Sequence, residues 1–192
     1  MNENAVKSGK VKRIAMGVAW SIIQFVPLSV FLILAETGDD NYDPWPRAFM
    51  TGGSIAAIGF IIVWNFAQRL RFDRLLIGVN VFLIIGGLIT ASDNESLIGV
   101  YRWLREAAMF GWIIVVGLIA TLSTKRGFID VEHNDSKTIQ RASWLALICC
   151  GIAFGISFYF RGGGSLWAAP APFIGLVIAR RLVQWRCITS RQ

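Results

Sequence analysis

The sequence predicts an all-α membrane protein, a bundle of about six transmembrane helices that forms one domain over residues 1–192. Of the 192 residues, 55% are hydrophobic and 16% are charged, whereas a soluble domain carries about 25% charged residues. The charges occur in short clusters between long apolar runs, and the mean hydropathy is +0.55. A helix needs roughly 20 mostly apolar residues to cross a hydrocarbon core about 30 Å thick. Runs of about this length fill most of the chain.

Six apolar runs can be separated along the chain. The first is too long for a signal-peptide core, and acidic residues from Glu36 onward follow it where a small-residue cleavage site is expected. It is therefore interpreted as a retained first span. The predicted spans are 14–35, 48–67, 75–91, 107–123, 143–160 and 166–183.

The basic residues are concentrated in alternate connections, and this orients the spans. Most of the 19 Lys and Arg residues fall at the N-terminus, after the second and fourth spans, and at the C-terminus. Excess Lys and Arg stay on the cytoplasmic side. Both termini are therefore expected in the cytoplasm of a multi-pass protein of the bacterial inner membrane. The net charge of +7 then indicates contact with anionic lipid headgroups, not a nucleic acid surface.

Uncharged polar residues inside the predicted spans are Gln24, Asn65 and Asn80. Each can join neighbouring helices by hydrogen bonds, which contribute about 0.6 kcal/mol on average. The alternative is a polar path for a substrate. Asp, Glu, Lys and His are absent from the middle of every predicted span. This argues against a proton-coupled pump or ion relay, because such relays need titratable groups there.

Small residues recur four positions apart in the second and fifth predicted spans. Such pairs let helix backbones approach closely, so both segments are expected to be packing faces. The pairs are Gly52 with Ala56, Gly53 with Ala57, and Gly151 with Gly155.

The segment YRWLREA, residues 101–107, places charges where the fourth span begins. On a continuous helix Arg102 and Glu106 are four residues apart and can form an ion pair, with Arg105 close by. One interpretation is an interfacial helix whose arginines reach the headgroups. The other is the charged lining of an outward-facing cavity, because charges in hydrocarbon are costly and usually functional.

The segment GGLITASDNE, residues 86–95, ends the third span with a glycine pair and an acidic cluster. Gly86 and Gly87 allow close approach of a neighbouring helix. Asp93 and Glu95 mark the point where the helix leaves the membrane on the non-cytoplasmic side. The alternative is that this segment forms a site with a function of its own.

Catalysis has little support in the sequence. His133 is the only histidine and lies in a polar loop. No Gly-rich phosphate loop, paired metal-ligand spacing or nucleophile elbow is present. The three cysteines, in apolar or membrane-adjacent segments, are interpreted as small buried hydrophobes. We therefore expect a protein that is not an enzyme and binds no cofactor or metal.

Three motifs in the first half of the chain resemble the bacterial intracellular septation protein A family. They are FVPLSVFLIL (25–34), RLRFDR (69–74) and FLIIGGLITASDNESLI (82–98). Members of that family are small polytopic inner-membrane proteins. The resemblance implies a non-enzymatic role in envelope maintenance, linked to division and envelope synthesis. The residues that take the family's motif positions are Pro27, Gly86, Gly87, Thr90, Asp93 and Glu95.

Two functions follow as hypotheses. The first is envelope maintenance or septation through contacts with other envelope or division proteins in the membrane. The second is transport of a small molecule or lipid through a cavity near Arg102, Arg105 and Glu106, with Pro170 and Pro172 interrupting the sixth span. A polar cavity lined also by Asn80 would favour transport, and a solidly packed bundle would favour contacts.

The charge distribution makes the topology testable. Reporters active only in the cytoplasm, fused to either terminus, are expected to be active at both, because Lys and Arg crowd the same side. The control is a fusion within residues 92–96, which is expected to be inactive. Termini that report from opposite sides would overturn the even number of spans.

Overall fold

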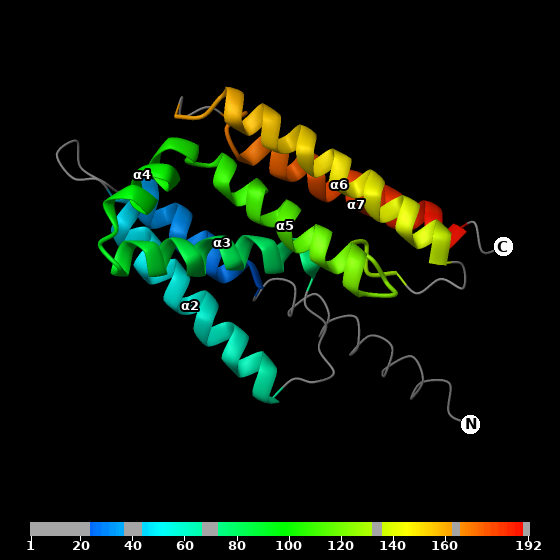
Figure 1. Ribbon diagram of the computed structural model, residues 1–192, viewed down its shortest axis with the longest axis horizontal. Helices are drawn as coiled ribbons and strands as arrows, with labels where there is room; N and C mark the ends of the chain where they lie inside the picture. The colour runs from blue at the N-terminus through cyan, green and yellow to red at the C-terminus, as the bar shows by residue number, and fades with distance from the viewer. Residues whose placement is uncertain (1–23, 37–43, 67–72, 132–135, 163–165, 190–192) are drawn as a thin grey trace, which may run out of the picture.

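The computed structural model describes residues 24–36, 44–66, 73–131, 136–162 and 166–189. All regular secondary structure in these ranges is helical, which confirms the all-α part of the predicted fold class for these residues. The elements are the helix Gln24–Glu36, α2 (Trp45–Phe66), α3 (Arg74–Ala91), α4 (Glu95–Leu104), α5 (Ala107–Ser123), α6 (Ser136–Tyr159) and α7 (Pro170–Thr189) (Figure 1).

The longer helices pack in chain order. α2 packs on α3, α3 on α5, α5 on α6, and α6 on α7, so that α3 and α5 occupy the middle of the bundle (Figure 1). The helix Gln24–Glu36 adds Phe31, whose ring lies 4.8 Å from that of Phe49 and 6.0 Å from that of Phe82. Its Phe25 lies 6.3 Å from Phe173 of α7. This helix therefore contacts both sides of the bundle.

Glycines set the spacing between the central helices. A Cβ atom on Gly53 of α2 would lie 2.6 Å from the carbonyl oxygen of Leu83, and one on Gly78 of α3 would lie 2.7 Å from the Cα of Ile113. These neighbours are backbone atoms, which have little room to move. The predicted packing face of the second span is confirmed. That of the fifth span is wrong, because a Cβ on Gly151 or Gly155 would meet no neighbouring atom within 4 Å.

A short polar segment bounds α4 at each end. The side chain of Asn94 caps it and accepts a hydrogen bond of 3.2 Å from the Leu97 amide. Asp93, just before this cap, has φ +50°. At the other end Arg105 also has φ +50°, and the axes of α4 and α5 differ in direction by 96°. α4 is therefore a separate element that lies across one end of the bundle (Figure 1).

Two helices of the described part, α3 and α6, are long and apolar enough to cross a membrane by length and composition. α4 and α5 would make a third only if the bent pair counts as one span. This is fewer than the six predicted spans. α5 has 17 residues, α7 carries Arg180, Arg181 and Arg186, and part of the first predicted span lies outside the described residues.

The helix bounds agree with the predicted spans to different degrees. α5 coincides with the predicted span 107–123, and α3 begins one residue before the predicted 75–91. α6 begins at Ser136, seven residues earlier than predicted, because a helix continues through polar residues such as Lys137 and Arg141 beyond its apolar part. α7 begins at Pro170, four residues later than predicted, since proline is well suited to the first helical position.

The glycine contact between α2 and α3 generates a prediction. Gly53→Ala is expected to destabilise the protein by about 1–3 kcal/mol, because the new methyl group must push a backbone carbonyl aside. The measurement is the thermal unfolding midpoint in detergent.

The matched control is Gly59→Ala in the same helix, where a Cβ would meet nothing within 4 Å. There alanine is expected to stabilise the helix by about 0.5–1 kcal/mol. Equal midpoints for the two variants would contradict the close approach of α2 and α3.

Candidate functional site: a groove between α2, α3 and α4

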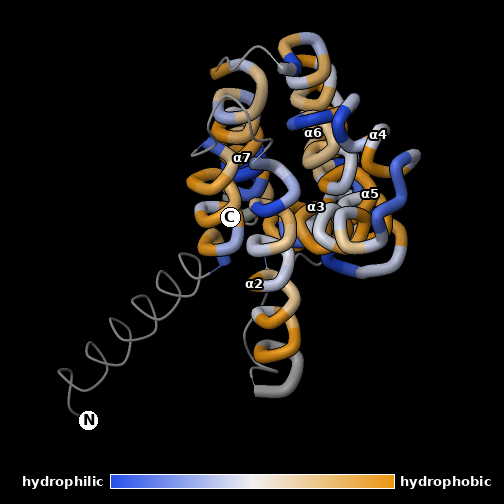
Figure 2. The backbone as a smooth tube through the Cα atoms, turned by 90° about the vertical axis from the view of Figure 1, so that its left-hand side faces the viewer, coloured by the Kyte–Doolittle hydropathy of each residue, from blue (hydrophilic) through white to orange (hydrophobic). Residues whose placement is uncertain are grey.

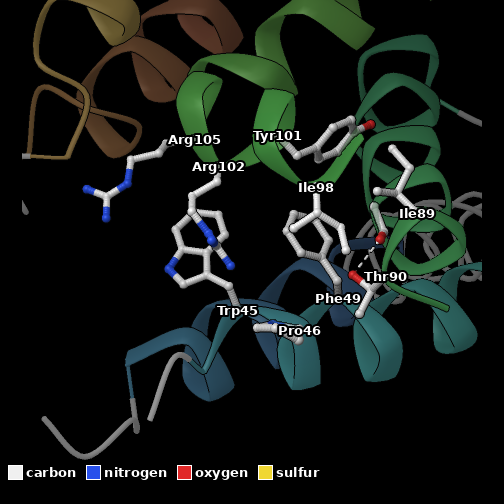
Figure 3. A pocket seen from close by; sticks show the side chains of 10 residues that line it. Trp45, Pro46, Phe49, Ile89, Thr90, Ile98, Tyr101, Arg102 and Arg105 are labelled. Carbon is white, nitrogen blue, oxygen red and sulfur yellow. Dashed lines mark hydrogen bonds between the residues drawn. The ribbon is translucent and has the colours of Figure 1, made fainter. Parts of the chain in front are cut away.

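A groove lies where α4 crosses the ends of α2 and α3, and its cavity volume is about 150 Å³ (Figure 3). α2 contributes Trp45, Pro46 and Phe49 to its walls. The α3 wall consists of Gly86, Ile89 and Thr90. The remaining wall is formed by α4 and the residue after it, with Ile98, Tyr101, Arg102 and Arg105.

The groove brings together four of the eight residues predicted as a functional site, Gly86, Thr90, Arg102 and Arg105. They come from the two segments singled out in the sequence, residues 86–95 and 101–107. The folding of α4 back over α3 is what joins them. Arg102 is exposed and Arg105 is half-buried.

Gly86 and Thr90 have structural explanations. A Cβ atom on Gly86 would collide with the Phe49 ring, so glycine is required for this ring to lie in the groove wall. The Thr90 hydroxyl donates a 2.8 Å hydrogen bond to the Gly86 carbonyl one turn earlier in α3. Gly87 lies outside the groove, where a Cβ would be 3.0 Å from the Phe49 carbonyl oxygen. The glycine pair therefore serves helix packing, as the sequence predicted.

An aromatic cluster supports the floor of the groove. The Tyr101 ring stacks on Phe82 with centroids 5.9 Å apart, and Phe49 lies 5.9 Å away at a steep angle. The Tyr101 hydroxyl accepts a 2.5 Å hydrogen bond from the indole nitrogen of Trp112 in α5. Burial raises the pKa of Tyr101 to about 12, because the phenolate is poorly solvated there. These contacts fix α4 against α3 and α5.

Three other predicted residues stay outside the groove. Asp93 and Glu95 are exposed in the turn before α4 and in its first turn, where a carboxylate interacts favourably with the helix dipole. The expected pairing of Arg102 with Glu106 assumed a continuous helix, whereas α4 ends at Leu104 and Arg105 has φ +50°. Glu106 is half-buried, and its Oε2 atom has no hydrogen-bond partner among the described residues.

The predicted polar residues in the spans differ in their contacts. Gln24 does join two elements, since its Oε1 accepts a 3.1 Å hydrogen bond from the Asp73 amide. Asn80 does not bridge helices, because its amide nitrogen donates to the Leu76 carbonyl of its own helix at 2.9 Å. The side chain of Asn65 lies outside the described part.

Arg161 was missed as a site residue in the sequence analysis. Its guanidinium lies over two rings, 3.9 Å from the centroid of Phe158 and 4.5 Å from that of Trp103. This holds the end of α6 against α4. The next residue, Gly162, has a positive φ of +75°. A Cβ atom at this position would collide with the Arg105 guanidinium, so the contact with Arg105 also requires glycine. An arginine following the aromatic run SFYF was the available signal.

A second cluster of charged residues lies at the opposite end of the bundle. Asp73 caps α3 and forms an ion pair with buried Arg180 of α7. Arg74 forms a 3.2 Å ion pair with Asp130 and donates a 2.8 Å hydrogen bond to Thr124. Two of the basic residues that served as a topology signal are therefore also cross-links between helices.

Comparison of the chain with family models, curated proteins and solved structures gives no match. The resemblance to the septation protein A family therefore rests on the three sequence motifs alone. Among the residues of the described ranges, no group of three His, Cys, Asp or Glu side chains is placed to hold a metal ion.

The Tyr101–Trp112 hydrogen bond generates a prediction. Tyr101→Phe is expected to lower stability by about 1 kcal/mol, because the half-buried indole N–H of Trp112 loses its acceptor. Burial raises the pKa of Tyr101 to about 12, so the unfolded chain ionises first and the parent protein loses stability between pH 10 and about 12, a loss that Tyr101→Phe lacks. Thermal unfolding of both proteins across this pH range measures the effect.

Tyr159→Phe is the control, since Tyr159 is 81% exposed. It is expected to leave the midpoint unchanged. A Tyr101→Phe protein as stable as the parent at pH 8 would show that the aromatic cluster does not depend on this hydrogen bond.

Proposed function

We propose that the chain is a multi-pass protein of the bacterial inner membrane with six spans. The observation that carries this proposal is the large number of apolar side chains exposed on the outer faces of the helices. Hydrophobic residues recur along most of the length of these helices (Figure 2). Soluble monomers rarely expose contiguous apolar patches above a few hundred Å², and a bilayer covers such a surface. Side chains that are more than half exposed on α5, α6 and α7 include Ile119, Leu122, Ile148, Ile152, Ile174, Ile178 and Leu182.

Helix length supports the span count. At 1.5 Å per residue, the 17 residues of α5 extend about 26 Å, close to the thickness of a bilayer core. The charged residues of α7 lie in its second half, from Arg180 onward, where they can reach cytoplasmic headgroups. α4 then lies at the opposite interface.

Within that membrane the proposed role is non-enzymatic and depends on contacts with other envelope or division proteins. The centre of the bundle supports this role over transport. Gly78 contacts the Ile113 backbone, and Asn80 is enclosed and bonded to its own helix. The groove lies at one end only, and Asn80 is not among the residues that line it. The resemblance to the septation family supplies the link to division.

Transport of a small molecule or lipid is the second candidate, and the groove with Arg102 and Arg105 is the observation that favours it. The prolines expected to interrupt the sixth span do not support it. Pro170 and Pro172 lie in the first turn of α7, where proline needs no break in the helix.

A photo-crosslinking side chain placed at an exposed apolar position tests the contact role. Position 152 on α6 is expected to yield adducts with envelope or division membrane proteins in cells, because Ile152 is 58% exposed. Position 113 is the matched control, since Ile113 is fully buried at 0%. Mass spectrometry of the adducts identifies the partners.

The outcome that contradicts the proposal has two parts. One is the absence of envelope and division proteins among the adducts from positions 152, 119 and 174. The other is normal cell morphology in a strain that lacks the protein. Release or uptake of a small molecule or lipid by purified protein in vesicles would favour the transport alternative.

A further inference from the structure

α4 is joined to α3 and α5 through two residues with unusual backbone conformations. Three non-glycine residues of the described ranges have a positive φ, and two of them, Asp93 and Arg105, flank α4. Arg105 combines φ +50° with ψ −128°, which lies outside the regions that residues with a Cβ atom normally occupy. Such conformations are costly and persist only where surrounding contacts hold them. The contacts of α4 therefore decide whether both residues keep these conformations.

The first half of α4 packs loosely against the bundle. α4 contains no buried residue, and a Cβ atom on Gly99 would meet nothing within 4 Å. Leu97 and Val100 are 46% and 51% exposed, whereas Ile98 lines the groove (Figure 3). Segments with few buried apolar contacts open at a low cost in free energy. The first half of α4 therefore does little to oppose its movement.

The second half of α4 makes specific contacts with three other helices. The Tyr101 hydroxyl accepts the 2.5 Å hydrogen bond from Trp112 of α5, and the Tyr101 ring stacks on that of Phe82 in α3. The Trp103 ring lies 4.5 Å from the guanidinium of Arg161, which follows α6. Each of these is a contact between single side chains, so one substitution removes it.

The space enclosed by α4 is small. The groove has a volume of about 150 Å³, whereas sites for whole drug-sized molecules enclose about 300–1,000 Å³. Phe49 and Phe82, beneath Tyr101, are only 5% and 2% exposed. In this position α4 therefore keeps an apolar surface covered at one end of the bundle (Figure 1).

We propose that α4 is a hinged lid that closes this groove, with Asp93 and Arg105 as its hinges. Hinges are a few residues at the ends of elements that absorb changes in φ and ψ. In the closed lid, which the structure describes, the contacts of the second half of α4 hold both hinges at positive φ. In the open lid these contacts are broken, both hinges return to negative φ, and Phe49 and Phe82 are uncovered. The device depends on contacts within the chain and not on the membrane location.

Distances between two spin labels on the full-length protein in nanodiscs test the proposal. The labels are attached through non-natural amino acids at position 99 of α4 and position 58 of α2, so the native cysteines stay in place. Both positions have room for a label, since Gly99 has no close neighbour and Ile58 is 56% exposed. The parent protein is expected to show one main distance for the closed lid and a minor, longer distance for the open lid.

Two variants weaken the contacts that keep the lid closed. Tyr101→Phe is expected to raise the ratio of open to closed lid about fivefold, the effect of losing one hydrogen bond on an equilibrium. Arg161→Gln removes the cation over the Trp103 ring and is expected to raise the ratio in the same direction. Tyr159→Phe is the matched control, since this tyrosine is exposed, and it is expected to leave the ratio unchanged.

Substitutions at the first hinge test the backbone part of the proposal. Glycine adopts a positive φ at little cost, so Asp93→Gly removes the strain that favours opening and is expected to lower the ratio of open to closed lid about threefold. Added to Tyr101→Phe, it is expected to reverse part of the opening. Asp93→Ala is the matched control, because it removes the same carboxylate but keeps a Cβ atom, and it is expected not to lower the ratio.

Three results would overturn the proposal. One is the same single distance in the parent, Tyr101→Phe and Arg161→Gln proteins. Another is an open lid that is more populated in Asp93→Gly than in the parent. The third is an equally large change for labels at positions 58 and 119, on α2 and α5, because this pair reports on the bundle without the lid. The reporter fusions and crosslinks test the membrane location and the contact role independently, so their failure is distinguishable from failure here.

Discussion

The close approach of α2, α3 and α5 is the constraint on which the rest of the structure depends. It requires glycine at two positions. A Cβ atom on Gly53 would collide with the Leu83 carbonyl, and one on Gly78 would collide with Ile113. With α2 and α3 at this distance, Phe49 can reach across to α3 beside Gly86 and meet Tyr101. The aromatic cluster then holds α4, and α4 closes the groove. A wider spacing between the central helices would remove the groove as well as the core.

Sequence reasoning located the helices best where apolar composition and helix ends coincide. Both ends of α5 were predicted to the residue, because the sequence changes abruptly from polar to apolar after Glu106 and back to polar at Thr124. α6 was predicted too short, because polar residues such as Lys137 continue a helix that hydropathy alone does not detect. Fewer than six of the described helices are long and apolar enough to cross a membrane, since α5 is short and the second half of α7 carries arginines.

The candidate site was predictable in its residues more than in its geometry. Arg102 and Arg105 were identified because charges near a membrane span are costly, but the expected pairing of Arg102 with Glu106 assumed a continuous helix. The positive φ of Arg105 (+50°) has no signature in residues 101–107, since arginine rarely adopts a positive φ. Asp73 and Arg180 are 107 positions apart in the sequence, so no local pattern brings them together. Tertiary folding decides both features.

One carboxylate oxygen of Asp73 makes two interactions. Its Oδ1 accepts the Leu75 amide hydrogen bond that begins α3 and also pairs with the Arg180 guanidinium of α7. Sliding α7 along its axis by one turn, about 5.4 Å, would separate that pair and leave Arg180 buried without its anion. The same carboxylate therefore fixes the first turn of α3 and the position of α7 along its axis. Sliding of α7 along that axis is costly for this reason.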